Sequence, residues 1–286
     1  MRVPRDLLID LHTHSNASDG TESPAGVVGS AAAAGLDVVA LTDHDTTAGW
    51  DEAAEAALRS GVALVRGTEV SARSAGISVH LLSYLHDPTH PALVAQNDEV
   101  RLARSDRART MVRLLGRDFD VTWDDVLAQT EPGTTIGRPH IADALVHAGY
   151  APDRSAAFAT ILRTGSDYYV PHYAPDALDA IRAVRAAGGV PVFAHPGADG
   201  RGRVVGDEVI EEMAAAGLLG LEVQHRDNGP EQQRRLTMMA RSLDLFVTGS
   251  SDYHGAGKPN RLGENTTDPA VLALIEEIGR SDVIRP

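Results

Sequence analysis

The chain has 286 residues, enough for one large domain or two small ones with a buried core. It contains no cysteine, so disulfides, thiolate metal sites and cysteine nucleophiles are excluded, and His, Asp or Glu must hold any metal. A net charge of −14 argues against long nucleic acid or an anionic membrane as a partner. The apolar run at residues 7–11 is too short for a signal peptide or a spanning helix, so we expect a cytoplasmic protein.

Short apolar runs alternate with amphipathic, Ala-rich stretches along most of the chain. This pattern predicts βα units in a mostly parallel sheet or barrel. The expected strands begin near Leu7, Asp37, Val62, Ile77, Val190, Leu218 and Leu245. The expected helices between them are Pro24–Gly35, Asp51–Arg59, Ala177–Ala187, Asp207–Ala216, Pro230–Ser242 and Pro269–Gly279.

The alternation stops between residues 87 and 175, where helical periodicity dominates and no convincing core strand appears. The helices expected there are Pro91–Leu115, Thr122–Ala128, Pro139–Ala148 and Arg154–Arg163. We interpret residues 87–175 as a helical insertion subdomain. Residues 1–86 and 176–286 then form the α/β domain.

Histidines and carboxylates gather where the expected strands end, and in βα folds these ends share one face. His12 and His14 follow the first strand, and the alternation of an extended chain places both on the same side. The other members of the set are Asp19, Asp43, His44, Asp45, Glu69, His80, His195, Asp252 and His254. Each alone has an ordinary explanation as a turn or polar residue. Their recurrence at six strands predicts a metal centre of imidazoles and carboxylates.

The remaining histidines fit less well into this set. We expect His86, His90 and His147 to be loop or helix-surface residues. His225 follows another expected strand, so it stays open as either an ordinary polar residue or a further ligand.

Taken together, these residues resemble the PHP family, the polymerase and histidinol phosphatase domain of metal-dependent phosphoesterases. The matching motifs cover nearly the whole chain in the family's order. They are Asp10-Leu11-His12-Thr13-His14, Leu41-Thr42-Asp43-His44-Asp45, Gly67-Thr68-Glu69, His80, Ala194-His195-Pro196 and Ser251-Asp252-Tyr253-His254. The resemblance implies an α/β fold, a distorted (β/α)7 TIM-like barrel, with the insertion covering the active site.

The resemblance also implies a centre of two or three metal ions at the carboxyl ends of the strands. The implied ligands are His12, His14, Glu69 and Asp252 for one ion, Glu69, His80 and His195 for a second, and Asp19, His44 and His254 for a third. Manganese is the first choice of metal, with iron, zinc or magnesium as alternatives. Asp43 is expected to support a ligand residue or cap a helix. Asp45 is expected either to play such a supporting role or to bind a metal ion itself.

Such a centre implies hydrolysis of a phosphate ester by in-line attack of a metal-bridging hydroxide. The proton donor to the leaving oxygen would be His195 or a metal-bound water.

The insertion indicates what is bound. Among the six arginines from Arg101 to Arg117, we expect Arg104 and Arg107 to contact substrate, because their segment looks like a basic stretch of the nucleotide-phosphatase branch. The rest fit a solvated helix face. Further candidate contacts are Thr135, Arg138 and His140 at a helix start, which would bind an anion or cap the helix, and His172 beside a Tyr pair suited to base stacking.

These features predict a phosphatase acting on a small phosphorylated substrate, a nucleoside 3′,5′-bisphosphate or nucleoside monophosphate. The alternatives are a 5′-to-3′ exoribonuclease on short RNA, a histidinol phosphatase, and, from another class, a noncatalytic PHP module.

Overall fold

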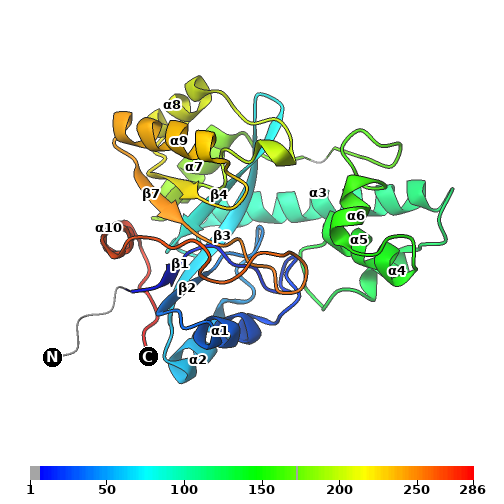
Figure 1. Ribbon diagram of the computed structural model, residues 1–286, viewed down its shortest axis with the longest axis horizontal. Helices are drawn as coiled ribbons and strands as arrows, with labels where there is room; N and C mark the ends of the chain where they lie inside the picture. The colour runs from blue at the N-terminus through cyan, green and yellow to red at the C-terminus, as the bar shows by residue number, and fades with distance from the viewer. Residues whose placement is uncertain (1–6, 172) are drawn as a thin grey trace.

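The computed structural model describes residues 7–171 and 173–286. A seven-stranded sheet forms its centre, and the strands lie side by side in chain order. Figure 1 shows this sheet between two groups of helices. The strands are β1 (Ile9–Asp10), β2 (Val38–Leu41), β3 (Ala63–Ser74), β4 (Ile77–Tyr84), β5 (Val190–Phe193), β6 (Gly220–Gln224) and β7 (Phe246–Gly249).

The sheet curls until its two ends meet. Strands β1 to β3 are parallel, β4 is antiparallel to both β3 and β5, and β5 to β7 are parallel again. Beyond β1 and β7, a parallel bridge joins Thr13 to Tyr253, and the backbone N–H of His14 donates to the Tyr253 carbonyl at 2.8 Å. The predicted distorted barrel is thereby confirmed.

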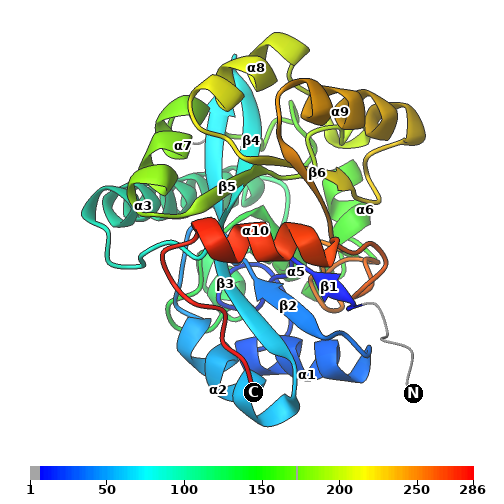
Figure 2. The same ribbon diagram turned by 90° about the vertical axis from the view of Figure 1, so that its left-hand side faces the viewer.

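Helices cover the barrel on two sides. Figure 2 shows α1 (Pro24–Ala33) and α2 (Trp50–Ser60) on one side, with α7 (Ala177–Ala186), α8 (Asp207–Ala215) and α9 (Pro230–Ser242) opposite. Helix α10 (Pro269–Ile278) packs Leu272 and Ile275 against the core residues of β1 and β2. The barrel is therefore filled with apolar side chains at the end remote from the predicted metal centre.

The helices of residues 87–175 extend away from the barrel (Figure 1). They are α3 (Pro91–Leu115), α4 (Trp123–Leu127), α5 (Arg138–His147) and α6 (Arg154–Ala159). Met111, Leu115, Ile141 and Leu145 are buried in an apolar cluster that these helices share. The first three helices lie where they were predicted, whereas α6 ends at Ala159, four residues before the expected Arg163.

Two expectations are corrected. Strand β3 continues past Glu69 to Ser74 and turns through Ala75 and Gly76, both with positive φ, into β4. Glu69 therefore lies within a strand, not at its end. His86 is buried, not at the surface: its Nδ1 lies 2.8 Å from the Ser83 hydroxyl.

Among the described helices, none combines the length and apolar character that crossing a membrane requires.

Candidate metal centre

Glu69 lies at the middle of the centre, and its side chain is buried. Its Oε2 atom lies 3.2 Å from His12 Nε2 and 3.1 Å from His14 Nε2. The same oxygen lies 3.3 Å from His44 Nδ1. His12 and His14 leave β1 on the same face, as the alternation predicted, and their Nε2 atoms are only 3.0 Å apart.

The other carboxylate oxygen of Glu69 faces two further imidazoles. Oε1 lies 2.8 Å from His80 Nδ1 and 3.1 Å from His195 Nε2. His80 comes from β4, which is antiparallel and lies next to β3, so its side chain reaches the centre from within the strand. One carboxylate thus lies among five imidazoles.

Two more carboxylates complete the set. Asp252 Oδ1 is 3.5 Å from the Nε2 atoms of His12 and His14. Asp19 Oδ1 lies 3.1 Å from His254 Nε2, and its Oδ2 lies 3.7 Å from His44 Nε2. Each of the nine residues implied as ligands therefore places a nitrogen or oxygen atom close to another member of the set.

Three groups of these residues bring their ligand atoms within 4.8 Å of one another in the described chain. They are His12, His14, Glu69 and Asp252; His14, Asp19, His44 and His254; and His44, Glu69 and His80. The first matches an expected set and the second contains one. The third differs, because His44 joins Glu69 and His80, while His195 approaches Glu69 from outside the group.

The unpaired atoms of this space test whether a metal fits. His44 Nδ1, His80 Nδ1 and His254 Nε2 are buried, and none forms a hydrogen bond of suitable geometry among the residues described, although each lies close to a carboxylate oxygen. Buried nitrogen lone pairs beside carboxylates are what a divalent cation needs, and a set without sulfur suits manganese, iron, zinc or magnesium. The residues present therefore fit metal ions.

The carboxylates stay ionised in this space. Burial raises the pKa of Glu69, but His44, His80 and His12 outweigh it and hold that pKa well below its ordinary value. Burial likewise opposes the charged form of His14, yet Asp252 and Glu69 raise its pKa to about 9. Negative carboxylates at neutral pH favour cations, and arriving metal ions would displace the imidazole protons.

Backbone strain is concentrated here. Asp45, His195 and Asp252 have φ values of 54°, 35° and 56°, which residues with side chains rarely adopt. Such conformations cost free energy and persist where the surrounding structure requires a particular side-chain direction. At all three positions the side chain is aimed at the centre or at a residue beside it.

Glu222, in the middle of β6, is a site residue that the sequence did not reveal. It is fully buried, its Oε1 accepts from His12 Nδ1 at 2.9 Å, and its Oε2 accepts from the His195 backbone N–H at 2.7 Å. The Ser250 hydroxyl also donates to it. A carboxylate that accepts from Nδ1 leaves the Nε2 lone pair free for a metal. The sequence held one signal for Glu222: it lies shortly before His225, which follows the same expected strand.

The two aspartates beside His44 have different roles. Asp43 accepts hydrogen bonds from the Ser15 backbone at 2.8 Å and from the Ser18 hydroxyl at 2.6 Å, so it holds the loop that follows β1. It supports that loop and not His44. Asp45 accepts from the Ser71 backbone at 2.7 Å and pairs with Arg104 Nε at 3.0 Å.

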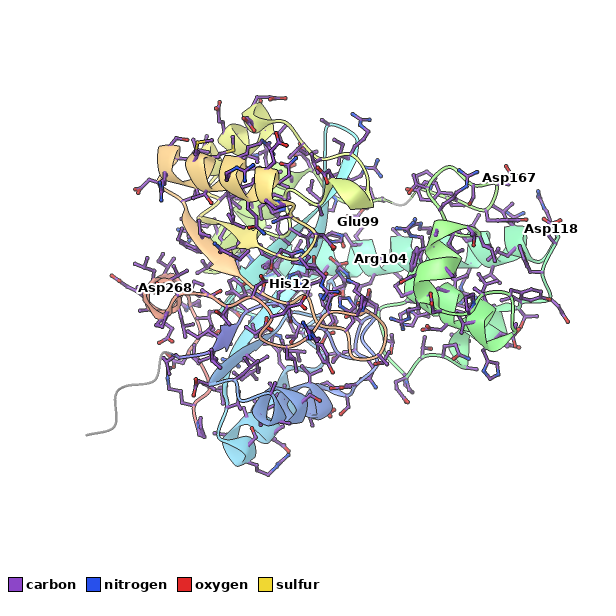
Figure 3. The ribbon with its side chains drawn as sticks, in the orientation of Figure 1. His12, Glu99, Arg104, Asp118, Asp167 and Asp268 are labelled. Atoms are coloured by element: carbon purple, nitrogen blue, oxygen red, sulfur yellow. The ribbon has the colours of Figure 1, made fainter. Side chains whose placement is uncertain are left out.

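The predicted substrate contacts lie within residues 87–175. Arg104 projects from α3 into the same central region as His12 (Figure 3). Arg107 Nε donates to the Val170 carbonyl at 2.6 Å, and its guanidinium lies 5.3 Å from the Tyr169 ring centre. Arg138 lies 5.7 Å from the same ring. Arg107 and Arg138 therefore lie around the same tyrosine.

The remaining predicted substrate contacts have different positions and partners. His140 Nδ1 accepts from the Gly137 backbone N–H at 3.1 Å, which gives it the capping role. The Thr135 backbone donates to the Ala17 carbonyl at 3.0 Å, beside the loop of Asp19, and its buried hydroxyl has no partner among residues 7–171 and 173–286. His172 lies outside the described residues.

Comparison with known proteins places this geometry in a family. The model of the PHP domain matches residues 10–113. The chain is 34% identical over 280 residues to a 3′,5′-nucleoside bisphosphate phosphatase of Chromobacterium violaceum, covering 97% of this chain and 98% of that protein. It is 34% identical over 260 residues to a 5′-3′ exoribonuclease of Haemophilus influenzae, covering 90% and 93%.

A solved structure shares the whole fold. It is a candidate metal-dependent phosphoesterase from Bifidobacterium adolescentis, 49% identical, with a TM-score of 0.94 over 97% of this chain and 98% of that one. The barrel, the buried imidazole and carboxylate centre and these relatives agree. The chain therefore belongs to the PHP family and is a metal-dependent phosphoesterase.

Proposed function

We propose that this phosphoesterase hydrolyses a phosphate monoester of a small nucleotide, a nucleoside 3′,5′-bisphosphate or a nucleoside monophosphate. The observation that carries the proposal is a pair of arginines that share one tyrosine ring. Arg107 and Arg138 both contact the Tyr169 ring, and neither forms an ion pair with a carboxylate within the described residues. Burial, followed by the charge of Arg138, lowers the pKa of Arg107 to about 10.

Two such guanidiniums repel each other unless an anion lies close by. Arginine presents a planar fork of donors that matches phosphate oxygens, and half-buried positions strengthen this pairing. An aromatic ring is a surface on which a nucleobase stacks, and here the Arg107 and Arg138 guanidiniums lie against the Tyr169 ring. The Chromobacterium violaceum relative, named for nucleoside bisphosphates, supports a nucleotide as substrate.

We further propose the assignment of the metal ligands. The three groups described above, together with His195, would hold up to three ions, with manganese as the preferred metal and Glu69 shared between ions. When bound, the ions would supply the Lewis acidity that neutralises phosphoryl oxygens and activates water. Residues 87–175 would form an insertion that covers this centre, while residues 1–86 and 176–286 form the barrel.

The chain's own residues prepare the site for this chemistry. Glu222 fixes the tautomer of His12, and Asp45 holds the Arg104 guanidinium toward the barrel. We assign His195 to metal binding, because its Nε2 faces Glu69 Oε1 at 3.1 Å. Of the two proton donors considered from the sequence, this assignment favours a water at the centre.

A second candidate function is 5′-to-3′ hydrolysis of short RNA. The likeness to the Haemophilus influenzae exoribonuclease supports it, since the same attack cleaves a phosphodiester. A net charge of −14 restricts such a substrate to a few nucleotides, because long RNA is bound through many phosphate contacts.

The test compares four substrates with the manganese-loaded enzyme: adenosine 3′,5′-bisphosphate, AMP, histidinol phosphate and a short 5′-phosphorylated RNA. We expect kcat/KM to be highest for one of the two nucleotides, and Glu69→Ala to abolish phosphate release. Faster cleavage of histidinol phosphate or RNA would refute the nucleotide assignment. Absence of bound metal and of all turnover would support the noncatalytic alternative.

A further inference from the structure

His225 lies beside the metal centre but belongs neither to the three ligand groups nor, unlike His195, to the residues that contact Glu69. Its side chain is fully buried beyond the end of β6, and its ring centre lies 5.4 Å from that of His195. Its Nε2 atom lies 3.6 Å from Asp252 Oδ2. The residue therefore borders two of the side chains that we propose as metal ligands.

The polarity of its hydrogen bonds sets His225 apart from the ligands. A neutral imidazole that binds a metal through one nitrogen carries its proton on the other, which must then donate. His12 Nδ1 faces the Glu222 carboxylate at 2.9 Å, and His254 Nδ1 faces the Asp252 carbonyl at 2.8 Å, as this rule requires.

His225 has the opposite arrangement. Its Nδ1 lies 3.1 Å from the backbone nitrogen of Asp227, and a backbone N–H can only donate. The Nδ1 atom therefore carries the lone pair, and in the neutral ring the proton is on Nε2. His225 presents an N–H donor to the centre where the ligands present lone pairs.

This donor lacks a protein partner. His225 Nε2 is buried without a hydrogen bond in the described part of the chain. The nearest carboxylate oxygen, Asp252 Oδ2, is too distant for an ordinary N–H···O bond and lies 3.0 Å from the Lys258 ammonium. A buried donor without a protein partner needs a partner from outside the chain, and next to a metal centre a substrate oxygen is one.

A cation lies close to this donor. Lys258, the chain's only lysine, contacts the same Asp252 oxygen that His225 approaches, and so offsets the charge of that carboxylate. We propose that His225 is a substrate-binding residue and not a metal ligand: its Nε2–H donates a hydrogen bond to an oxygen of the phosphoryl group. The inference rests on the phosphoesterase activity of this site and holds whichever nucleotide is cleaved.

The test measures the binding of inorganic phosphate to the manganese-loaded full chain by calorimetry, together with metal content by elemental analysis. His225→Leu removes the donor, whereas His225→Gln keeps an amide N–H at a similar reach. His86→Leu is the matched control, because it removes a buried imidazole outside the centre. Thermal unfolding of each variant establishes that it is folded.

We expect His225→Leu to weaken phosphate binding about 10- to 100-fold, the usual effect of losing a hydrogen bond to a charged group, with the wild-type number of ions per chain. His225→Gln should recover most of the affinity, and His86→Leu should bind like the wild type. Should His225→Leu not fold, His225→Met makes the same comparison.

Two results would overturn the proposal. Loss of an ion in both His225 variants would make the residue a ligand, and unchanged phosphate affinity in a folded His225→Leu would remove its contact with the phosphoryl group. Phosphate binding is measured without any nucleotide. The result for His225 therefore does not depend on whether the nucleotide assignment is correct.

Discussion

Glu222 offers the sharpest test of how the metal centre is built. The variant Glu222→Gln keeps the volume and removes the charge. In the wild type, one carboxylate oxygen accepts from His12 Nδ1 at 2.9 Å and the other accepts from the His195 backbone at 2.7 Å. A glutamine must turn its NH₂ group toward one of these two donors. One hydrogen bond is lost, and two donors then face each other in a buried space.

The magnitude follows from the environment of this carboxyl group. Burial raises the pKa of Glu222, but His12 and its neighbours outweigh burial and lower that pKa from 4.5 to about 2. A shift of this size corresponds to about 3 kcal/mol in favour of the charged form. This value is the upper limit for the interaction free energy that Glu222→Gln removes. Replacing a residue that orients a ligand usually costs about 10- to 100-fold in metal affinity, or about 1.4 to 2.7 kcal/mol.

We therefore expect Glu222→Gln to raise the manganese dissociation constant about 10- to 100-fold. Competition with a chelator measures this constant, and elemental analysis counts the ions. Activity at limiting manganese should fall in parallel and recover at excess manganese. The control is Glu276→Gln, which removes a partly exposed carboxylate that pairs with Arg285. A folded Glu222→Gln that binds manganese as the wild type does would refute the orienting role.

Three further predictions concern substrate binding, pH and the insertion. Arg138→Ala should raise KM for the nucleotide about 10- to 100-fold and change kcat little, because the contact that we propose between this guanidinium and the anion is made before and during reaction; equal losses in kcat would contradict this. Burial lowers the pKa of His86 to about 4, from 6.5 in the unfolded chain. The unfolded state then binds more protons between these values, so stability falls as pH falls, by about 3 kcal/mol from this residue below pH 4. Urea unfolding across this range should show a smaller loss for His86→Gln, and an identical pH profile would count against the burial argument. Leu115→Ala leaves a cavity in the apolar cluster of the insertion and should lower the free energy of unfolding by about 2 to 5 kcal/mol, measured by urea titration; a loss below about 1 kcal/mol would mean that the cluster is loosely packed.

Local features of the sequence determined most of the secondary structure. The start of α1 follows from Ser23, whose side chain accepts from the Gly26 N–H, and from Pro24 in the first turn. The period of apolar residues predicted the bounds of α3 correctly. These signals are readable because capping and helix periodicity involve neighbours a few residues apart.

The placement of the imidazoles could also be predicted, although their geometry could not. Strand alternation places His12 and His14 on one face without knowledge of the rest of the fold. The extension of β3 past Glu69 was missed, because the sequence does not distinguish a strand that ends at a site from one that passes through it.

The tertiary structure alone decided which residues support the centre. Glu222 accepts from His12 across 210 positions, and Arg104 of α3 pairs with Asp45, which follows β2. The role of His225 depends on a single backbone N–H, which fixes its tautomer. Charge pairing and tautomers depend on distances of about 3 Å. Such distances exist only after the chain has folded, so the sequence determined which residues were available for the chemistry and the fold determined what each one does.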